Sequence, residues 1–120
     1  MPTIMAGLAC GEPSIISWKI IDAYADGFIT CPDYVAAEGM RMLANPLNGD
    51  TRIVSGESGA VGAGLIREIM RNPDLAEVKE HLQIDGSSRV LIISTEGATD
   101  HAHYNAVVWD GKNPSYFESD

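Results

Sequence analysis

Basic residues are scarce in this sequence. Its 120 residues include 8 Lys and Arg against 17 Asp and Glu, which gives a formal net charge of −9. Phosphate backbones and anionic lipid headgroups repel a surface with this charge. The charge balance therefore argues against binding to nucleic acid or to a membrane surface.

The chain also lacks long apolar runs and has little cysteine. No apolar stretch approaches the roughly 20 residues of a membrane-spanning helix, and residues 1–13 lack the basic start and long apolar stretch of a signal peptide. Cys10 and Cys31 are too few for a disulfide scaffold and do not have metal-ligand spacing. We therefore expect a cytoplasmic protein with reduced thiols. The sequence does not decide whether these two cysteines form a disulfide bond with each other.

What the chain does contain is an alternation of helical and strand-like patterns. Apolar periodicity and breakers predict five helices, near 14–24, from Pro32 to about Leu43, after a Gly-rich turn to about Arg71, from Asp74 to about Leu82, and from Thr99 or Asp100 onward. Three short apolar runs predict strands at 27–31, 52–55 and 90–94.

Short apolar strands separated by helices are typical of a parallel sheet covered on both faces. The expected fold class is therefore α/β, a three-layer αβα arrangement with a small, mostly parallel sheet. A chain of this length fits one domain, over 1–120, with an irregular tail at 110–120.

Two turns follow predicted strands and lead into predicted helices, SGESGA at 55–60 and STEGATD at 94–100. Ligands bind at this end of the strands in open α/β sheets, and glycines, hydroxyls and free amides suit an anion or a ring nitrogen. Glu57 and Glu96 argue against a plain phosphate site, so a cation, a ligand amine or the backbone is the better partner for them. The alternative is that the hydroxyl residues only cap helices and form turns: Ser55, Ser58, Thr95 and Thr99.

The histidines, Cys10 and the small residues could also belong to a functional site, but for each of them we prefer a structural role. No dinucleotide or phosphate-loop motif is present. His101 and His103 are two apart on a predicted helix and point to different faces, so no metal site is assigned. Cys10 is either a small buried hydrophobe or a reactive thiol, and we prefer the first. The small residues Gly59, Ala60, Ala63 and Gly64 predict close packing of a helix on the sheet.

Four segments carry more than these patterns. They are PTIMAGLACGEPS at 2–14, CPDYVAAEGMRMLANPLNGD at 31–50, RIVSGESGAVG at 52–62 and LIISTEGATD at 91–100. Together they resemble the C-terminal part of the diaminopropionate ammonia-lyases, pyridoxal-phosphate enzymes of fold type II in the tryptophan-synthase-β-like superfamily. The resemblance runs from Pro2 to about Tyr104. It implies a lyase that eliminates the β-amino group of 2,3-diaminopropionate and releases pyruvate and ammonia.

The resemblance also implies cofactor-binding residues. In this superfamily a hydroxyl at the end of a late strand hydrogen-bonds the pyridine nitrogen of the cofactor, which by position is Ser94, with Thr95 as the second choice. A neutral hydroxyl leaves that nitrogen largely unprotonated, which favours elimination. The first turn is expected to form part of the cofactor site too: Ser55, Gly56, Glu57, Ser58 and Gly59. Within it, Glu57 is expected to bind a cation or anchor the loop. Gly11 and Glu12 are expected to line the substrate entrance.

One departure from the family matters for catalysis. The three lysines, Lys19, Lys79 and Lys112, lie in predicted helix or tail positions and not in the context of the family's Schiff-base lysine. No Gly-rich loop for the cofactor phosphate is present either. Both are expected in an N-terminal half of the same enzyme. Because a Schiff base with an activated lysine begins this chemistry, we expect the chain alone to be inactive.

The whole lyase is expected to be a homodimer that acts on a small amino acid. The alternative interpretation is a stand-alone α/β module that binds a ligand or drives oligomerisation.

Overall fold

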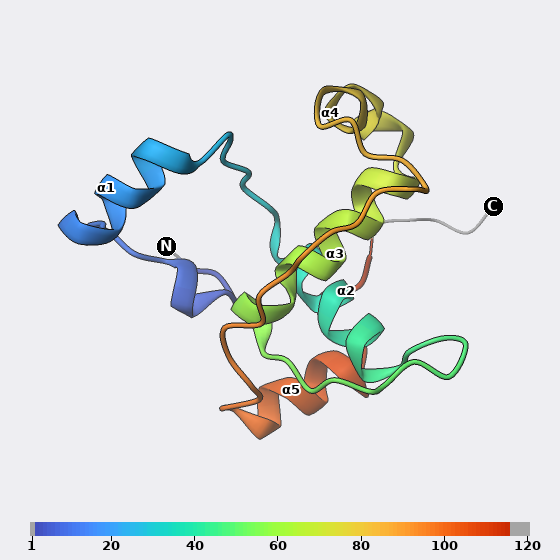
Figure 1. Ribbon diagram of the computed structural model, residues 1–120. Coiled ribbons are helices and arrows are strands. Elements are labelled where there is room, and N and C mark those ends of the chain that lie inside the picture. Colours follow the sequence, from blue (N-terminus) through green and yellow to red (C-terminus); the bar gives the residue numbers. More distant parts are fainter. Residues whose placement is uncertain (1, 116–120) are drawn as a thin grey trace.

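The computed structural model describes residues 2–115, and all of the regular structure in this part of the chain is helical (Figure 1). The α-helices are α1 Ile15–Tyr24, α2 Asp33–Ala44, α3 Glu57–Arg71, α4 Ala76–His81 and α5 His101–Val108. Two short 3-10 helices, η1 Ala6–Leu8 and η2 Pro73–Leu75, complete the set. The helices therefore lie where the sequence pattern placed them.

Side-chain caps explain several of the helix starts. The Ser14 hydroxyl accepts a hydrogen bond from the backbone N–H of Ser17 at 3.4 Å and caps α1. A carboxylate oxygen of Asp100 accepts from the backbone N–H of His103 at 3.0 Å and caps α5. Such caps satisfy backbone donors that the first turn of a helix leaves without an intrahelical partner.

The expected three-layer αβα fold with a parallel sheet is wrong for this chain. Residues 2–115 contain no strand, and the runs predicted as strands, 27–31, 52–55 and 90–94, lie outside regular structure. A strand forms only where its backbone groups pair with another strand, and no ladder of backbone hydrogen bonds joins these runs in the part of the chain that is described. Their apolar side chains consequently remain exposed, to 70% at Phe28 and 88% at Leu91.

Helices α2 and α3 cross in close contact at the centre of the molecule (Figure 1). A Cβ on Gly39 of α2 would collide with the carbonyl oxygen of Ala60, and a Cβ on Gly64 of α3 would collide with that of Val35. The small residues of α3 do mark close packing, but the partner is a helix and not a sheet. Helix α5 adds the rest of the core, whose buried members are Ala37, Met40, Ala60, Tyr104 and Val107.

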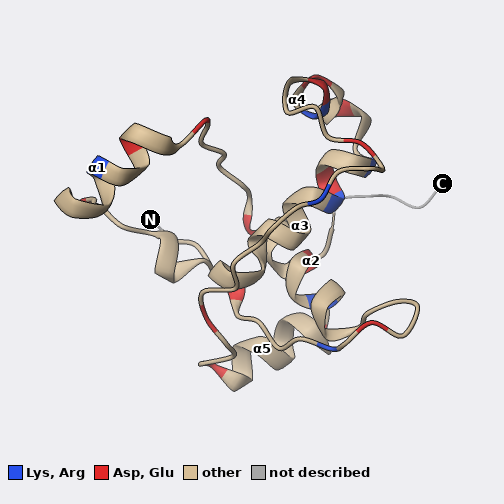
Figure 2. Ribbon diagram, in the orientation of Figure 1, with Lys and Arg blue, Asp and Glu red and all other residues tan. Residues whose placement is uncertain are grey.

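Charged side chains also enter the contact between α2 and α3. Glu38 and Glu68 are 3% and 2% exposed, Glu38 forms an ion pair with Arg67, and the Tyr34 hydroxyl donates to Glu68 Oε2 at 3.3 Å. Partial burial lowers the pKa of Arg67. The other acidic positions are spread over the helices and loops (Figure 2).

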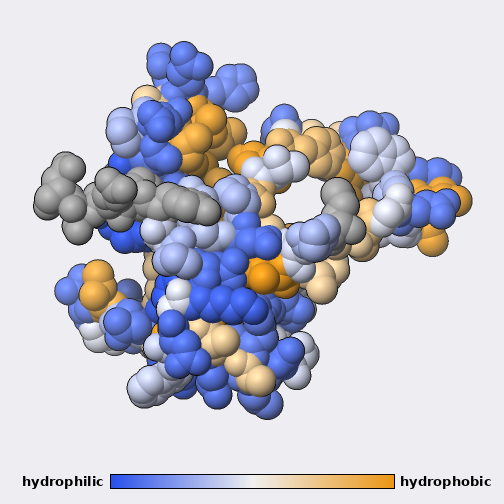
Figure 3. All heavy atoms as spheres, turned by 180° about the vertical axis from the view of Figure 1, so that it is seen from behind, coloured by the Kyte–Doolittle hydropathy of each residue, from blue (hydrophilic) through white to orange (hydrophobic). Residues whose placement is uncertain are grey.

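The N-terminal arm, residues 9–30 with α1, stands away from the crossing of α2 and α3 (Figure 1). Its helix exposes a row of large apolar side chains: Ile15, Ile16, Trp18, Ile20, Ile21 and Tyr24. The view from behind shows apolar atoms on this arm and near α4 (Figure 3). None of the helices in residues 2–115 combines the length and the apolar character needed to cross a bilayer.

The C-terminal segment is tied to α2 by one arginine. Arg41 Nη1 donates to the carbonyl oxygens of Val107 and Lys112 at 3.3 and 3.1 Å, and Nη2 donates to that of Asn113 at 3.1 Å. Burial of the guanidinium lowers the pKa of Arg41. In the expected irregular tail, 111–115 form no helix, and 116–120 lie outside the described residues.

Candidate functional site

The two turns singled out in the sequence lie against each other. The backbone N–H of Gly56 donates to the carbonyl oxygen of Glu96 at 3.1 Å. The hydroxyl oxygens of Ser55 and Ser94, which are 39 residues apart in the chain, are separated by 2.7 Å. The turns therefore meet although no sheet connects them in residues 2–115.

The two hydroxyls differ in their surroundings. Ser55 is fully buried, whereas Ser94 is exposed. Gly59 in the first turn of α3 packs directly on the pair, since a Cβ there would lie 2.7 Å from Ser55 Oγ and 2.9 Å from Ser94 Oγ. The site thus consists of a buried hydroxyl that supports an exposed one, in a space that a glycine leaves open.

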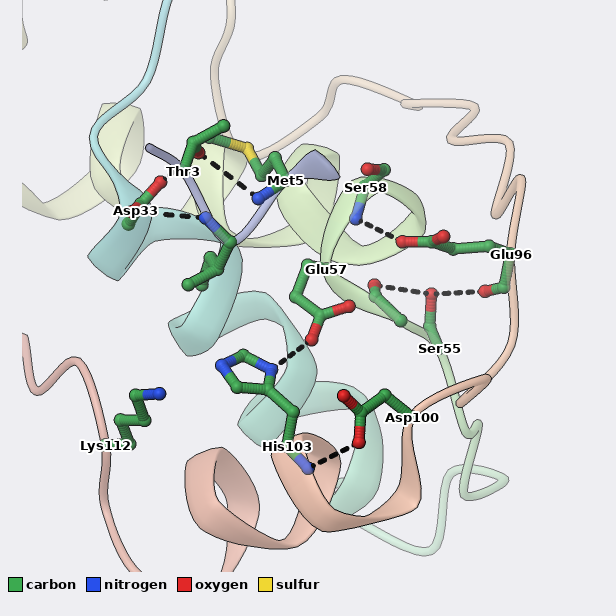
Figure 4. Close-up of polar contacts among 12 residues, drawn as sticks. Thr3, Met5, Asp33, Ser55, Glu57, Ser58, Glu96, Asp100, His103 and Lys112 are labelled. Atoms are coloured by element: carbon green, nitrogen blue, oxygen red, sulfur yellow. Dashed lines mark hydrogen bonds and ion pairs between the residues drawn. The ribbon is translucent and has the colours of Figure 1, made fainter. Parts of the chain in front are cut away.

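Glu96 joins the second turn to the start of α3. The residue before α3 is Gly56, which has no side chain to cap the helix. Instead, Glu96 Oε1 accepts a hydrogen bond from the backbone N–H of Ser58 at 2.7 Å (Figure 4). The backbone was one of the partners expected for Glu96 from the sequence, and Glu96 does bind a backbone N–H. The carboxylate also suits the positive end of the helix dipole.

Glu57 faces α5, where its carboxylate contacts Nδ1 of His103 (Figure 4). Both side chains are largely buried, at 16% and 19% exposed. They lie beside a cavity of about 340 Å³. Its lining consists of Thr3, Ile4, Ala6, Gly7, Glu57, Glu96, Thr99, Asp100 and His103.

Sequence reasoning missed His103 as the partner of Glu57. The two residues are 46 positions apart, so no local spacing relates them. The only signal is that His103 falls in the first turn of a helix capped by Asp100.

The other residues expected at the site are exposed to solvent, and the lysines lie in other parts of the chain. Thr95 is exposed next to Ser94. Gly11 and Glu12 are exposed in the loop that leads to α1, with no atom within 4 Å of a Cβ built at Gly11. Lys19 lies in α1 and Lys79 in α4, while Lys112 follows α5. No group of three or more His, Cys, Asp or Glu within residues 2–115 is arranged to hold a metal ion.

The two cysteines have different environments. Cys10 is exposed, so the preferred interpretation of this residue as a buried hydrophobe is wrong. The reason is that the stretch of chain around it is not covered by other elements, since residues 6–30 are all exposed. Cys31 is partly buried next to apolar cavities. Burial, and secondarily the charge of Glu68, raise the pKa of its thiol.

Comparison with known proteins identifies relatives of one kind. No family model matches the chain. The chain is 52% identical over 113 residues to the diaminopropionate ammonia-lyase of Escherichia coli (strain K12), and 52% identical over 114 residues to that of Salmonella typhimurium. In each case the match covers 94% of this chain and 28% of the relative. The chain therefore spans less than a third of the length of these curated relatives.

Solved structures lead to the same relatives. The Escherichia coli diaminopropionate ammonia-lyase in complex with an aminoacrylate-PLP azomethine reaction intermediate matches with a TM-score of 0.88 and 51% identity, over 95% of this chain and 30% of that one. The same enzyme in complex with D-serine matches with a TM-score of 0.84 and 50% identity, over 89% of this chain and 27% of that one. The chain is homologous to the C-terminal part of diaminopropionate ammonia-lyase.

Proposed function

We propose that this chain is the C-terminal part of a pyridoxal-phosphate-dependent lyase that converts 2,3-diaminopropionate to pyruvate and ammonia. The observation that carries the proposal is the exposed Ser94 hydroxyl, held at 2.7 Å by the buried Ser55 hydroxyl, in a chain 52% identical to such lyases. By the family resemblance, this is the hydroxyl expected to face the pyridine nitrogen of the cofactor.

The residues present fit that cofactor at its ring nitrogen. A hydroxyl has one donor and two acceptor positions. Ser94 is an exposed residue, and the contact of its Oγ with Ser55 Oγ occupies only one of these positions. It can therefore donate to a pyridine nitrogen that carries no proton. Thr95, exposed beside it, is the second choice. A neutral partner does not force a proton onto the nitrogen, in contrast to a carboxylate.

Bound pyridoxal phosphate would supply the electron sink that stabilises negative charge at the substrate Cα. The residues of this chain would hold and orient the cofactor ring. Ser94 would fix the ring through its hydroxyl, and Glu96 would keep the turn of Ser94 against α3 through its bond to the backbone of Ser58. Gly56 and Gly59 allow the two turns to approach, since a Cβ on either would lie within 3 Å of atoms of Glu96.

The Glu57 contact with His103 links α3 to α5, which supports a role of Glu57 in anchoring the first turn. Gly11 and Glu12 would line the substrate entrance, in the exposed loop before α1.

The Schiff-base lysine and the phosphate loop would come from an N-terminal part of the same enzyme. Lys19, Lys79 and Lys112 are the only lysines in the sequence, and none follows the pattern of the family's cofactor lysine. The chain alone is therefore inactive in this proposal. The complete lyase would be a cytoplasmic homodimer with a small amino acid as substrate.

A hybrid enzyme tests the proposal. The part of the Escherichia coli lyase that precedes the matched region is fused to this chain, and pyruvate release from 2,3-diaminopropionate is measured for the hybrid and for the 120-residue chain. The hybrid is expected to release pyruvate and the chain alone to release none. A folded hybrid without activity would contradict the lyase proposal. Sustained pyruvate release by the chain alone would contradict the assignment of the lysine to another part of the enzyme.

A further inference from the structure

We propose that Ser55 is a positioning residue that directs the hydroxyl proton of Ser94 toward the bound ligand. The inference deepens the proposed function and rests on it. It starts from the 2.7 Å separation of Ser55 Oγ and Ser94 Oγ, which is the usual length of a hydrogen bond between hydroxyls. By distance alone, either oxygen can be the donor.

Burial decides which of the two donates. Ser55 is fully buried, and its other acceptors, the carbonyl oxygens of Gly56 and Glu96, are both 3.5 Å away. That distance is beyond the range of a good O–H···O bond. If Ser94 were the donor, the proton of a buried hydroxyl would have no well-placed acceptor, which is unfavourable. Ser94 is exposed, so its own proton can be donated to solvent or to a ligand. We therefore infer that Ser55 donates and Ser94 accepts.

The direction of this bond determines what Ser94 can recognise. With one lone pair occupied by the proton of Ser55, the O–H of Ser94 points away from the buried side of the pair. An outward O–H donates to a neutral acceptor such as an unprotonated aromatic nitrogen. Ser94 has one competing acceptor, the carbonyl oxygen of Glu96 at 3.4 Å. That distance is also long for an O–H···O bond, so without Ser55 the hydroxyl of Ser94 is expected to rotate freely and lose its outward direction.

A double-mutant cycle in the hybrid enzyme tests this coupling. The variants are Ser55→Ala, Ser94→Ala and the two combined, and the readout is the dissociation constant for pyridoxal phosphate, obtained by absorbance or fluorescence titration. Each single variant is expected to weaken binding about fivefold, as for the loss of one hydrogen bond. The combined variant is expected to bind no more weakly than Ser94→Ala, because Ser55 acts only through Ser94.

The outcomes separate the inference from the proposed function. If Ser94→Ala leaves the dissociation constant unchanged, the cofactor role of Ser94 in the proposed function fails. If Ser94→Ala weakens binding but Ser55→Ala has no effect, or has the same effect with and without Ser94, the positioning role of Ser55 is wrong.

A control variant tests whether a general loss of stability, rather than loss of the hydroxyl, weakens cofactor binding. Val107→Ala removes part of a fully buried side chain that belongs to the core between α2 and α5, and it is expected to lower stability without changing cofactor affinity. If Ser55→Ala does not fold, Ser55→Cys replaces it, because a thiol is a similar size but a weak donor. A folded Ser55→Cys hybrid with unchanged affinity would overturn the inference.

Discussion

The carboxylate of Glu96 caps helix α3 by accepting a hydrogen bond from the backbone N–H of Ser58, 38 residues earlier in the chain. The same residue accepts, through its carbonyl oxygen, from the backbone N–H of Gly56. One residue thus fixes both the start of a helix and the turn that carries Ser94. The site depends on this connection because Gly56 offers no cap of its own.

Removing the Glu96 carboxylate should destabilise the chain. Glu96→Ala is expected to lower the free energy of unfolding by about 1 kcal/mol, the usual effect of losing a helix N-cap. Glu96→Gln keeps an acceptor oxygen and should have a smaller effect. Denaturant unfolding measures both. Glu80→Ala, which removes an exposed carboxylate from α4, is the control, and an equal effect at Glu80 would show that the cap of α3 contributes nothing.

A side chain at Gly59 should disrupt the hydroxyl pair. The Cβ of Gly59→Ala would lie 2.7 Å from Ser55 Oγ and 2.9 Å from both Ser94 Oγ and the Glu96 carbonyl oxygen. Because the carbonyl is backbone, the turn itself must shift, and we expect the hybrid enzyme to bind pyridoxal phosphate about tenfold more weakly. Gly86→Ala makes the same change in open space. Parent-like affinity of the Gly59 variant would mean that the pair does not contact the cofactor.

A side chain at Gly64 should weaken the crossing of α2 and α3. Its Cβ would collide with the backbone of Val35 and Gly39, so Gly64→Ala is expected to lower the free energy of unfolding by about 2 kcal/mol, as overpacking does. Gly62→Ala in the same helix would meet a side-chain methyl of Ile92 at 2.9 Å, which can move aside. The Gly62 variant should be less destabilised, or even stabilised by its higher helix propensity. The opposite order of the two variants would contradict the close approach of the helices.

The two cysteines should differ in reactivity. The thiolate is the nucleophile, and burial together with the charge of Glu68 raises the pKa of Cys31, so less of it is thiolate at a given pH. Iodoacetamide is therefore expected to modify the exposed Cys10 first, and the rate at Cys31 should keep rising at higher pH. Mass spectrometry of the two peptides measures both rates. Glu68→Gln should accelerate modification of Cys31, and equal rates in the folded chain would contradict the assigned environments.

The helices could be predicted from sequence because their determinants are local. Ser14 and Asp100 cap the helices they precede. The small residues of α3 indicate a close contact with another element, which in the structure is α2. The sheet could not be predicted correctly, because strand formation depends on neighbours that the pattern of one run does not reveal. The exposed run around Leu91 has the composition of a buried strand and no neighbouring strand within residues 2–115.

The candidate site was predictable only in part. The two turns were singled out by their hydroxyls and glycines, and they do meet at Ser55 and Ser94. Which hydroxyl is buried and which exposed could not be read from the sequence, because both follow similar apolar runs. The contact of Glu57 with His103 joins residues 46 positions apart, and only the folded chain brings them together.

The separation of Ser55 and Ser94 along the chain has a consequence for the order of folding. The two residues are 39 positions apart, and the segment between them contains all of α3 and α4. Joining them therefore closes a long loop at a cost in chain entropy. The crossing of α2 and α3 joins segments closer in sequence and gains buried contacts at once. We expect the crossing to form early and the hydroxyl pair late. Protection of the Gly56 amide against hydrogen exchange during refolding would then mark the moment at which the site is complete.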